Sequence, residues 1–305
     1  MTHLPDARDP GGRLAHSAVF PAGWPDLAAR YVRVAPDERA RVVSNAPRAP
    51  HTGPAVVCLH GWGASAYGYR HVLGPLAAGG VAAHAADLRG HGWSDKPLDL
   101  ARYTPAALAN WTVRLLDALA LDRAVLVGHS LGGAVALHTA RAAPDRVAAL
   151  VLLAPLGLHA VDRIDQLRTL TPDLIEALVV QAAGFRAVTS LALHTAYGRI
   201  GRPSARDVDE YWAPTADPHF ARAIRLVFRA DRWDPLTPDA LAGLDLPVEV
   251  VIGTHDNLIR ASDLRATERL PRAAVDVVPD AGHVLPDEVP ERVLAAIARA
   301  RGAAS

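Results

Sequence analysis

A single serine lies between glycines in the pattern GHSLG, residues 128–132. This pattern matches G-x-S-x-G, in which a serine sits on a sharp turn between a strand and a helix. An apolar run precedes the pattern and an alanine-rich run follows it. Because the strand and the helix cross closely at such a turn, the residues two before and two after the serine must lack bulk, a need that Gly128 and Gly132 meet. We therefore predict that Ser130 is a nucleophile.

A serine hydroxyl needs a base to accept its proton, and the base needs a carboxylate to orient it. His283 follows the last predicted strand, in a loop that contains glycine and proline. Asp256 lies at the C-terminal end of the preceding strand, where ligands gather in α/β sheets. The adjacent His255 points the other way in extended backbone, so we expect it to be structural. Ser130, Asp256 and His283 thus form the predicted catalytic triad.

A carbonyl that is attacked by serine develops an oxyanion, which backbone N–H groups can stabilise. Leu131 offers one such group at the start of the predicted helix, where the helix dipole favours an anion. Trp62, in the loop HGWGAS, is the expected second donor. The remaining predicted substrate-binding residues flank these donors: His60, Gly61, Gly63 and His129.

Apolar strands alternate with helices along most of the chain, which predicts parallel strands joined by right-handed crossovers in an α/β sheet covered on both faces. The segments 30–35 and 39–44 predict a hairpin. Further strands are predicted over 54–60, 81–88, 123–129, 147–155, 247–254 and 273–279. Helices are predicted over 67–78, 104–120, 131–143, 261–270 and 287–301, with Thr104 as N-cap and Pro105 at the first position of the second one.

The alternation stops in the middle of the chain, where only helices are predicted, over 171–184, 187–198, 205–212 and 218–230. We interpret residues 157–235 as a helical cap, residues 26–156 and 236–305 as the core, and residues 1–25 as a loose, flexible arm. Seven of the sixteen aromatic residues fall in the cap, which favours a partly apolar pocket. The helix 218–230 carries arginines opposite its apolar face; we expect a solvated face there, with an anion site as the alternative.

Composition narrows the function classes. The 305 residues carry 32 basic and 32 acidic side chains, a balance that gives no sign of a nucleic-acid partner. Cys58 is the only cysteine, so no internal disulfide is possible. No secretory signal and no apolar stretch of membrane-spanning length is present, so we expect a cytoplasmic protein. Neither H-E-x-x-H nor CxxC occurs, so no metal and no cofactor is expected, and the oligomeric state stays open.

The chain resembles the α/β-hydrolase superfamily, in particular its capped esterase, lactonase and C–C hydrolase branches. The resemblance covers residues 30–305 and is carried by LHGWGAS, ADLRGHGWSDKP, VGHSLGG, GTHDN and AGHVLP in the family's order. It implies the same triad, a cap before the acid-bearing strand, and structural roles for Asp87, Arg89 and His91. Dehalogenases and epoxide hydrolases of this fold generally carry aspartate at the elbow, so the serine favours attack on a carbonyl.

The expected function is therefore that of a serine hydrolase for a small ester, lactone or thioester, acting through an acyl-enzyme. C–C bond hydrolysis, a lyase reaction and acyl transfer use the same site and stay open as alternatives. A hydrolase fold retained only for ligand or partner binding is a further alternative, which the intact triad disfavours.

Overall fold

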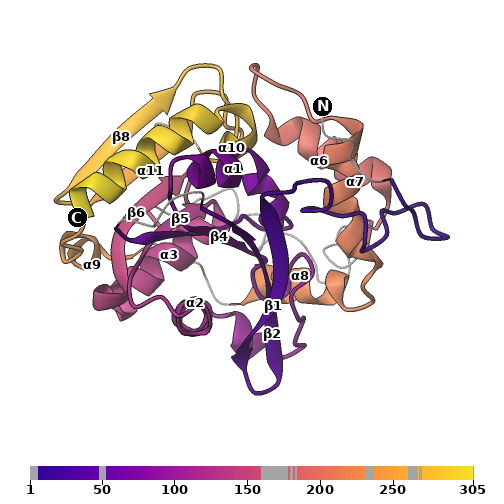
Figure 1. The fold of residues 1–305 in the computed structure, drawn as a ribbon, viewed down its shortest axis with the longest axis horizontal. Coiled ribbons are helices and arrows are strands. Elements are labelled where there is room, and N and C mark those ends of the chain that lie inside the picture. The colour runs from indigo at the N-terminus through magenta and orange to yellow at the C-terminus, as the bar shows by residue number, and fades with distance from the viewer. Residues whose placement is uncertain are drawn as a thin grey trace.

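The computed structural model describes residues 6–47, 53–158, 178, 181–182, 184–230, 236–259, 267 and 270–304. Its centre is an eight-stranded sheet in the order β1-β2-β4-β3-β5-β6-β7-β8 (Figure 1). β1 (Leu27–Ala35) and β2 (Glu38–Asn45) form the predicted hairpin, and β2 runs antiparallel to β4. The others pair in parallel: β3 (Ala55–Leu59), β4 (Ala83–Ala86), β5 (Ala124–His129), β6 (Val147–Leu153), β7 (Val248–Gly253) and β8 (Ala273–Val278).

Helices cover both faces of this sheet, which confirms the predicted α/β architecture. On one side α2 (Pro105–Ala118) packs against α3 (Leu131–Ala142), and on the other α1 (Arg70–Ala78) packs against α11 (Pro290–Ala304). Every residue of β3, β5, β6 and β7 is buried, as expected for parallel strands covered on both sides. Thr104 is the N-cap residue of α2, as predicted: its hydroxyl accepts a hydrogen bond from Ala107 N–H at 3.2 Å.

Several helix boundaries differ from the prediction. The segment 67–78 divides into a 3-10 helix, Ala66–Tyr69, and α1. The closing helix is interrupted: α10 (Leu285–Glu288) ends before Pro290, which opens α11 at the position where a missing N–H costs nothing. A short helix, α9 (Pro238–Ala242), was not predicted; Thr237 caps it. The helices predicted over 171–184 and 261–270 lie almost entirely outside the described residues.

The described part of the predicted cap, residues 157–235, contains α6 (Arg186–Ala196), α7 (Ala205–Trp212) and α8 (Phe220–Arg229), close to the predicted positions. α8 buries Phe220, Ile224 and Val227, while Arg222 and Arg229 are exposed. The apolar stripe therefore faces the protein, as the periodicity predicts.

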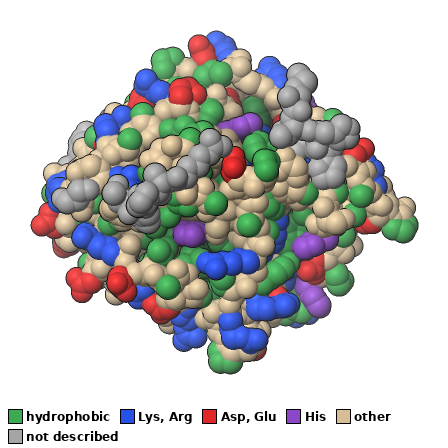
Figure 2. Space-filling view, in the orientation of Figure 1, with side chains coloured by type: hydrophobic (Ala, Val, Ile, Leu, Met, Phe, Trp, Pro, Cys, Tyr) green, Lys and Arg blue, Asp and Glu red, His purple; other side chains and the backbone are tan. Residues whose placement is uncertain are grey.

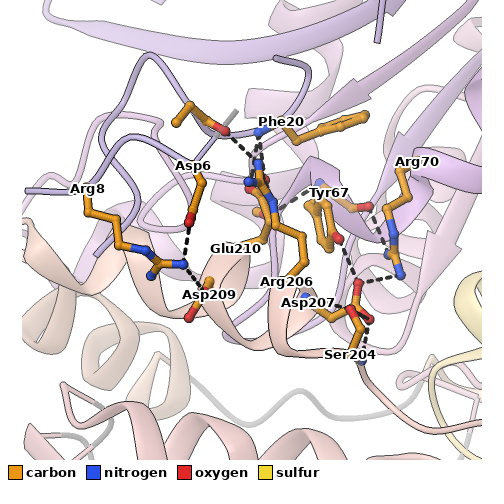
Figure 3. A network of polar contacts seen from close by, with 12 residues as sticks. Asp6, Arg8, Phe20, Tyr67, Arg70, Ser204, Arg206, Asp207, Asp209 and Glu210 are labelled. Carbon is orange, nitrogen blue, oxygen red and sulfur yellow. Dashed lines mark hydrogen bonds and ion pairs between the residues drawn. The ribbon is translucent and has the colours of Figure 1, made fainter. Parts of the chain in front are cut away.

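The N-terminal segment is not the loose arm that its Pro, Gly and charge content predicts. Leu14 and Phe20 are each only 2 % exposed. The Arg8 guanidinium lies 2.7 Å from Asp209 of α7, and Phe20 N–H donates to the Glu210 carboxylate at 3.0 Å (Figure 3). The prediction of a flexible arm is thus wrong for residues 6–25. The partners lie about two hundred positions away, where a local reading of composition cannot find them.

Charged side chains of both signs are interspersed on the face drawn in Figure 2, in keeping with the zero net charge. Among the helices of the described residues, none combines the length and the apolar character needed to span a bilayer.

Candidate active site

Ser130 occupies the turn between β5 and α3 in a conformation that few residues adopt. Its φ is 51° and its ψ is −115°, in the region of positive φ that is costly for a residue with a side chain. Neighbouring backbone holds it there: Ser130 N–H donates to Leu153 O at 2.9 Å, and Ser130 O accepts from Leu156 N–H at 3.0 Å. The predicted strained turn is therefore present, and these backbone hydrogen bonds offset the free energy of its unfavourable conformation.

Two glycines permit the close crossing at this turn. A Cβ atom on Gly128 would lie 2.4 Å from Gly132 O, and one on Gly132 would lie 2.1 Å from Leu59 O. Both distances are far below a van der Waals contact, so no side chain fits at either position. The steric need inferred from the sequence is thus seen in the backbone.

A hydrogen bond joins Asp256 and His283, the predicted acid and base. His283 Nδ1 donates to Asp256 Oδ2 at 2.8 Å, and Asp256 Oδ1 accepts from Leu258 N–H at 2.7 Å and Ile259 N–H at 2.8 Å. Burial by itself would raise the pKa of Asp256, but the hydrogen bond and charge of His283 and these two amides outweigh it and lower the pKa. The ionised carboxylate keeps the proton on Nδ1 and leaves Nε2 as the acceptor.

The imidazole of His283 lies beside the serine turn. Its ring centroid is 4.8 Å from that of His129, the residue before Ser130, and His129 Nε2 donates to His283 O at 2.8 Å. Within the described residues, no hydrogen bond joins the Ser130 hydroxyl to His283. Such catalytic hydrogen bonds often shorten only when substrate is bound.

The two histidines predicted to bind substrate form hydrogen bonds within the protein, His60 through both ring nitrogens and His129 through Nε2. His60 is 1 % exposed; its Nδ1 donates to Gly61 O at 2.7 Å and its Nε2 accepts from Leu88 N–H at 2.9 Å. Burial lowers the pKa of His60, and it lowers that of His129 to about 3. These hydrogen bonds show that His60 supports its own loop and that His129 supports the His283 backbone, and contact of either side chain with substrate stays a prediction.

The loop with the second expected oxyanion donor lies against the serine. A Cβ atom on Gly61 would be 3.2 Å from Ser130 Cβ, so the Gly61–Gly63 backbone approaches the nucleophile directly. Trp62 is 45 % exposed, its Nε1 donates to Ile224 O of α8 at 3.1 Å, and its ring centroid is 6.0 Å from that of Phe228. Leu131 begins α3, so its N–H belongs to the open end of that helix. Both expected donors therefore come from segments that meet at Ser130.

The loop after β4 is structural, as expected. Asp87 accepts from Ala66 N–H at 2.7 Å and from Trp93 N–H at 2.8 Å, and Arg89 forms an ion pair of 2.7 Å with Glu38. Across the chain segments that the structure describes, no group of three His, Cys, Asp or Glu side chains is placed to hold a metal ion.

Sequence reasoning missed Glu288, whose carboxylate accepts hydrogen bonds from two backbone N–H groups. One belongs to Gly282, next to His283, and the other to Gly198, two residues after the end of α6 in the predicted cap. The only local signal of Glu288 is its place five residues after the histidine. The partner Gly198 lies 90 positions away.

Comparison with known proteins identifies the fold family of the chain. The family model described as alpha/beta hydrolase fold matches residues 54–290. An uncharacterised protein of Mycobacterium tuberculosis is 31 % identical over 262 residues, which cover 81 % of this chain and 75 % of that protein. An epoxide hydrolase of Caballeronia sordidicola is 41 % identical over 98 residues, or 32 % of this chain and 30 % of the enzyme. The structure of a carboxylesterase from Bacillus subtilis superposes with a TM-score of 0.75 at 21 % identity, covering 91 % of this chain and 92 % of the esterase.

Proposed function

This chain belongs to the α/β-hydrolase fold family, and from that premise we propose that it is a serine hydrolase acting on a small ester, lactone or thioester. The observation that carries the proposal is the Asp256–His283 hydrogen bond of 2.8 Å beside a serine held at positive φ. A buried carboxylate that fixes the imidazole tautomer is the arrangement that makes a serine hydroxyl nucleophilic.

The reaction follows from the roles of these groups. Ser130 Oγ attacks the carbonyl carbon while His283 Nε2 takes its proton, and the N–H groups of Trp62 and Leu131 stabilise the oxyanion. When the tetrahedral intermediate collapses, the leaving group receives the proton from His283. Water then attacks the acyl-enzyme, passing a proton to His283, and the acid product leaves as Ser130 regains its hydrogen.

The residue at the elbow separates this proposal from attack on a saturated carbon. The relative from Caballeronia sordidicola is an epoxide hydrolase. Enzymes of that kind generally use an aspartate nucleophile, whereas this chain has serine at the elbow. Attack of serine on a saturated carbon would give an alkyl ether, which lacks the carbonyl through which the alkyl ester of an aspartate nucleophile is hydrolysed. Serine at position 130 therefore favours acyl chemistry.

The half-exposed Trp62, packed on Phe228, supplies an apolar surface between the oxyanion loop and the cap. Such a surface favours substrates with an apolar portion.

A fluorophosphonate probe tests the proposal, because it reacts with an activated serine. The wild type should be labelled at Ser130, and Ser130→Ala should abolish labelling and reduce kcat by several powers of ten with the fold retained, as judged by circular dichroism. Labelling at another residue, or none in the folded wild type, would refute the assignment. Turnover of nitrophenyl esters, lactones and diketones in ¹⁸O-water then identifies the reaction, since only hydrolysis places solvent oxygen in the acid product.

A further inference from the structure

The loop that carries His283 is bonded to the chain segment that leaves the cap helix α6. His283 N–H donates to Ala196 O at 2.8 Å, and Arg199 N–H donates to Asp280 O at 2.7 Å. These two bonds place the end of a cap helix directly on the backbone of the proposed catalytic base.

Glycines make the contact between these two backbones possible. A Cβ atom on Gly198 would lie 2.4 Å from Gly282 N, and one on Gly282 would lie 2.2 Å from Gly198 N. Main chain therefore touches main chain, with no side chain of either residue between them. Packing of apolar side chains cannot hold this contact, so polar groups must.

The Glu288 carboxylate holds this junction from the side of α10. Gly282 N–H donates to its two oxygens at 3.0 and 3.1 Å, and Gly198 N–H donates to Oε2 at 2.8 Å. The residue is 8 % exposed. The preceding residue, Asp287, strengthens the same contact: it accepts from the Tyr197 hydroxyl at 2.9 Å and pairs with Arg70 at 2.6 Å. Hydrogen bonds from backbone N–H groups to an ionised carboxylate are stronger than hydrogen bonds between neutral groups.

We propose that Glu288 is a positioning residue for His283, which it orients by fastening the adjacent backbone to the cap. The inference rests on the proposed function, in which His283 is the base. Each polar group of His283 that has a partner is directed by a different part of the molecule: its N–H by the cap, its C=O by His129, and its Nδ1 by Asp256. Loss of the Glu288 carboxylate releases Gly282, so the imidazole shifts relative to the serine.

The test compares Glu288→Gln and Glu288→Ala with Glu291→Gln, a matched control that removes the same charge from an exposed position three residues later. Glutamine keeps one acceptor oxygen but turns an NH₂ group toward the amide donors, whereas alanine removes both acceptors. The Nδ1 proton of His283, followed by NMR with ¹⁵N-labelled histidine and assigned with His283→Gln, reports the hydrogen bond to Asp256. Labelling of Ser130 by the fluorophosphonate probe reports the consequence for reactivity.

We expect the Nδ1 proton resonance to move upfield in Glu288→Gln and further, or to vanish, in Glu288→Ala. Labelling should slow by about tenfold to a hundredfold in Glu288→Ala, since a displacement near 1 Å can cost about that much, and by less in Glu288→Gln. Glu291→Gln should match the wild type in both measurements. Should Glu288→Ala fail to fold, Glu288→Gln carries the test.

Unchanged resonance in a folded Glu288 variant overturns the proposal, even if labelling slows, because the effect would not pass through the imidazole. A shifted resonance with an unchanged labelling rate overturns it as well. If the wild type is not labelled while the resonance shifts as expected, the hydrolase function fails and the positioning of the His283 side chain by Glu288 stands.

Discussion

Asp256→Asn is the most informative perturbation of the proposed triad, because the structure determines how the new amide must lie. The carboxylate accepts two backbone N–H groups on Oδ1, from Leu258 and Ile259, and one imidazole N–H on Oδ2. Asparagine has one acceptor oxygen and one donor NH₂. Placing the oxygen toward the two amides retains two hydrogen bonds, whereas the opposite orientation retains one and sets donor against donor. We therefore expect the NH₂ group to face His283.

That orientation traps the wrong tautomer of His283. Nδ1 must then accept a hydrogen bond, so the proton moves to Nε2, the atom that has to receive the proton of Ser130. In a characterised serine hydrolase with a Ser-His-Asp triad, a correct geometry with the wrong tautomer costs about 10⁴ in kcat, which corresponds to about 5.4 kcal/mol of transition-state stabilisation. We expect a loss of that size here, with little change in the urea midpoint because the two backbone hydrogen bonds remain.

The assay is steady-state hydrolysis of an activated ester, supported by the rate of fluorophosphonate labelling. Asp280→Asn is the matched control: its side chain is 54 % exposed, it lies in the loop of His283, and asparagine tolerates its φ of 62°. The control should retain kcat within about twofold. An Asp256→Asn enzyme that keeps more than a tenth of the wild-type kcat would show that tautomer control by Asp256 is not part of the mechanism.

Two further outcomes concern the fold. Gly132→Ala should destabilise the protein by about 1–3 kcal/mol, since its Cβ would lie 2.1 Å from Leu59 O. Gly302→Ala in α11, with open space around it, should instead gain up to about 1 kcal/mol from helix propensity, and equal urea midpoints of the two variants would contradict the close crossing. Burial lowers the pKa of His91 from 6.5 to about 3, so the unfolded chain binds a proton that the folded protein excludes. Between these two pKa values His91 by itself lowers the free energy of unfolding by up to about 1.4 kcal/mol for each unit that the pH falls. His91→Gln should flatten this slope by about one proton in urea titrations between pH 6 and 4, and an unaltered slope would mean that His91 is protonated in the folded state.

The sheet and its flanking helices were predictable because their signals are local. Apolar runs of strand length and helices with caps such as Thr104 repeat along the core, and each predicts its own element without reference to the rest. The boundaries were harder, because Pro290 can end one helix or begin another and only the conformation of Val289 decides. The ordered N-terminal segment was missed for a different reason: Arg8 and Phe20 find their partners on α7 only after the chain has folded.

In the candidate site, too, residues with a local sequence pattern were predictable, whereas contacts between distant segments were not. Ser130 is recognisable from the pattern of residues 128–132. Asp256 and His283 are recognisable because each follows one of the last two predicted strands, after Ser130 in the chain. The burial of His60 and the bond from His129 to the His283 carbonyl depend on which loops approach each other, so neither contact could be inferred from the sequence.

Glycines allow a close approach of two backbones both at the elbow and at the junction with the predicted cap, but only the first pair can be recognised in the sequence. At the elbow, Gly128 and Gly132 let a helix cross a strand four residues away, so the spacing itself is a motif. At the junction with the predicted cap, Gly198 and Gly282 let two backbones approach just as closely. These glycines are 84 residues apart, and no sequence pattern around one of them predicts contact with the other. The first contact holds the proposed nucleophile, and the second holds the proposed base. Because a carboxylate, and not packing, closes the second contact, the position of His283 depends on Glu288 in a way that no local pattern around the histidine reveals.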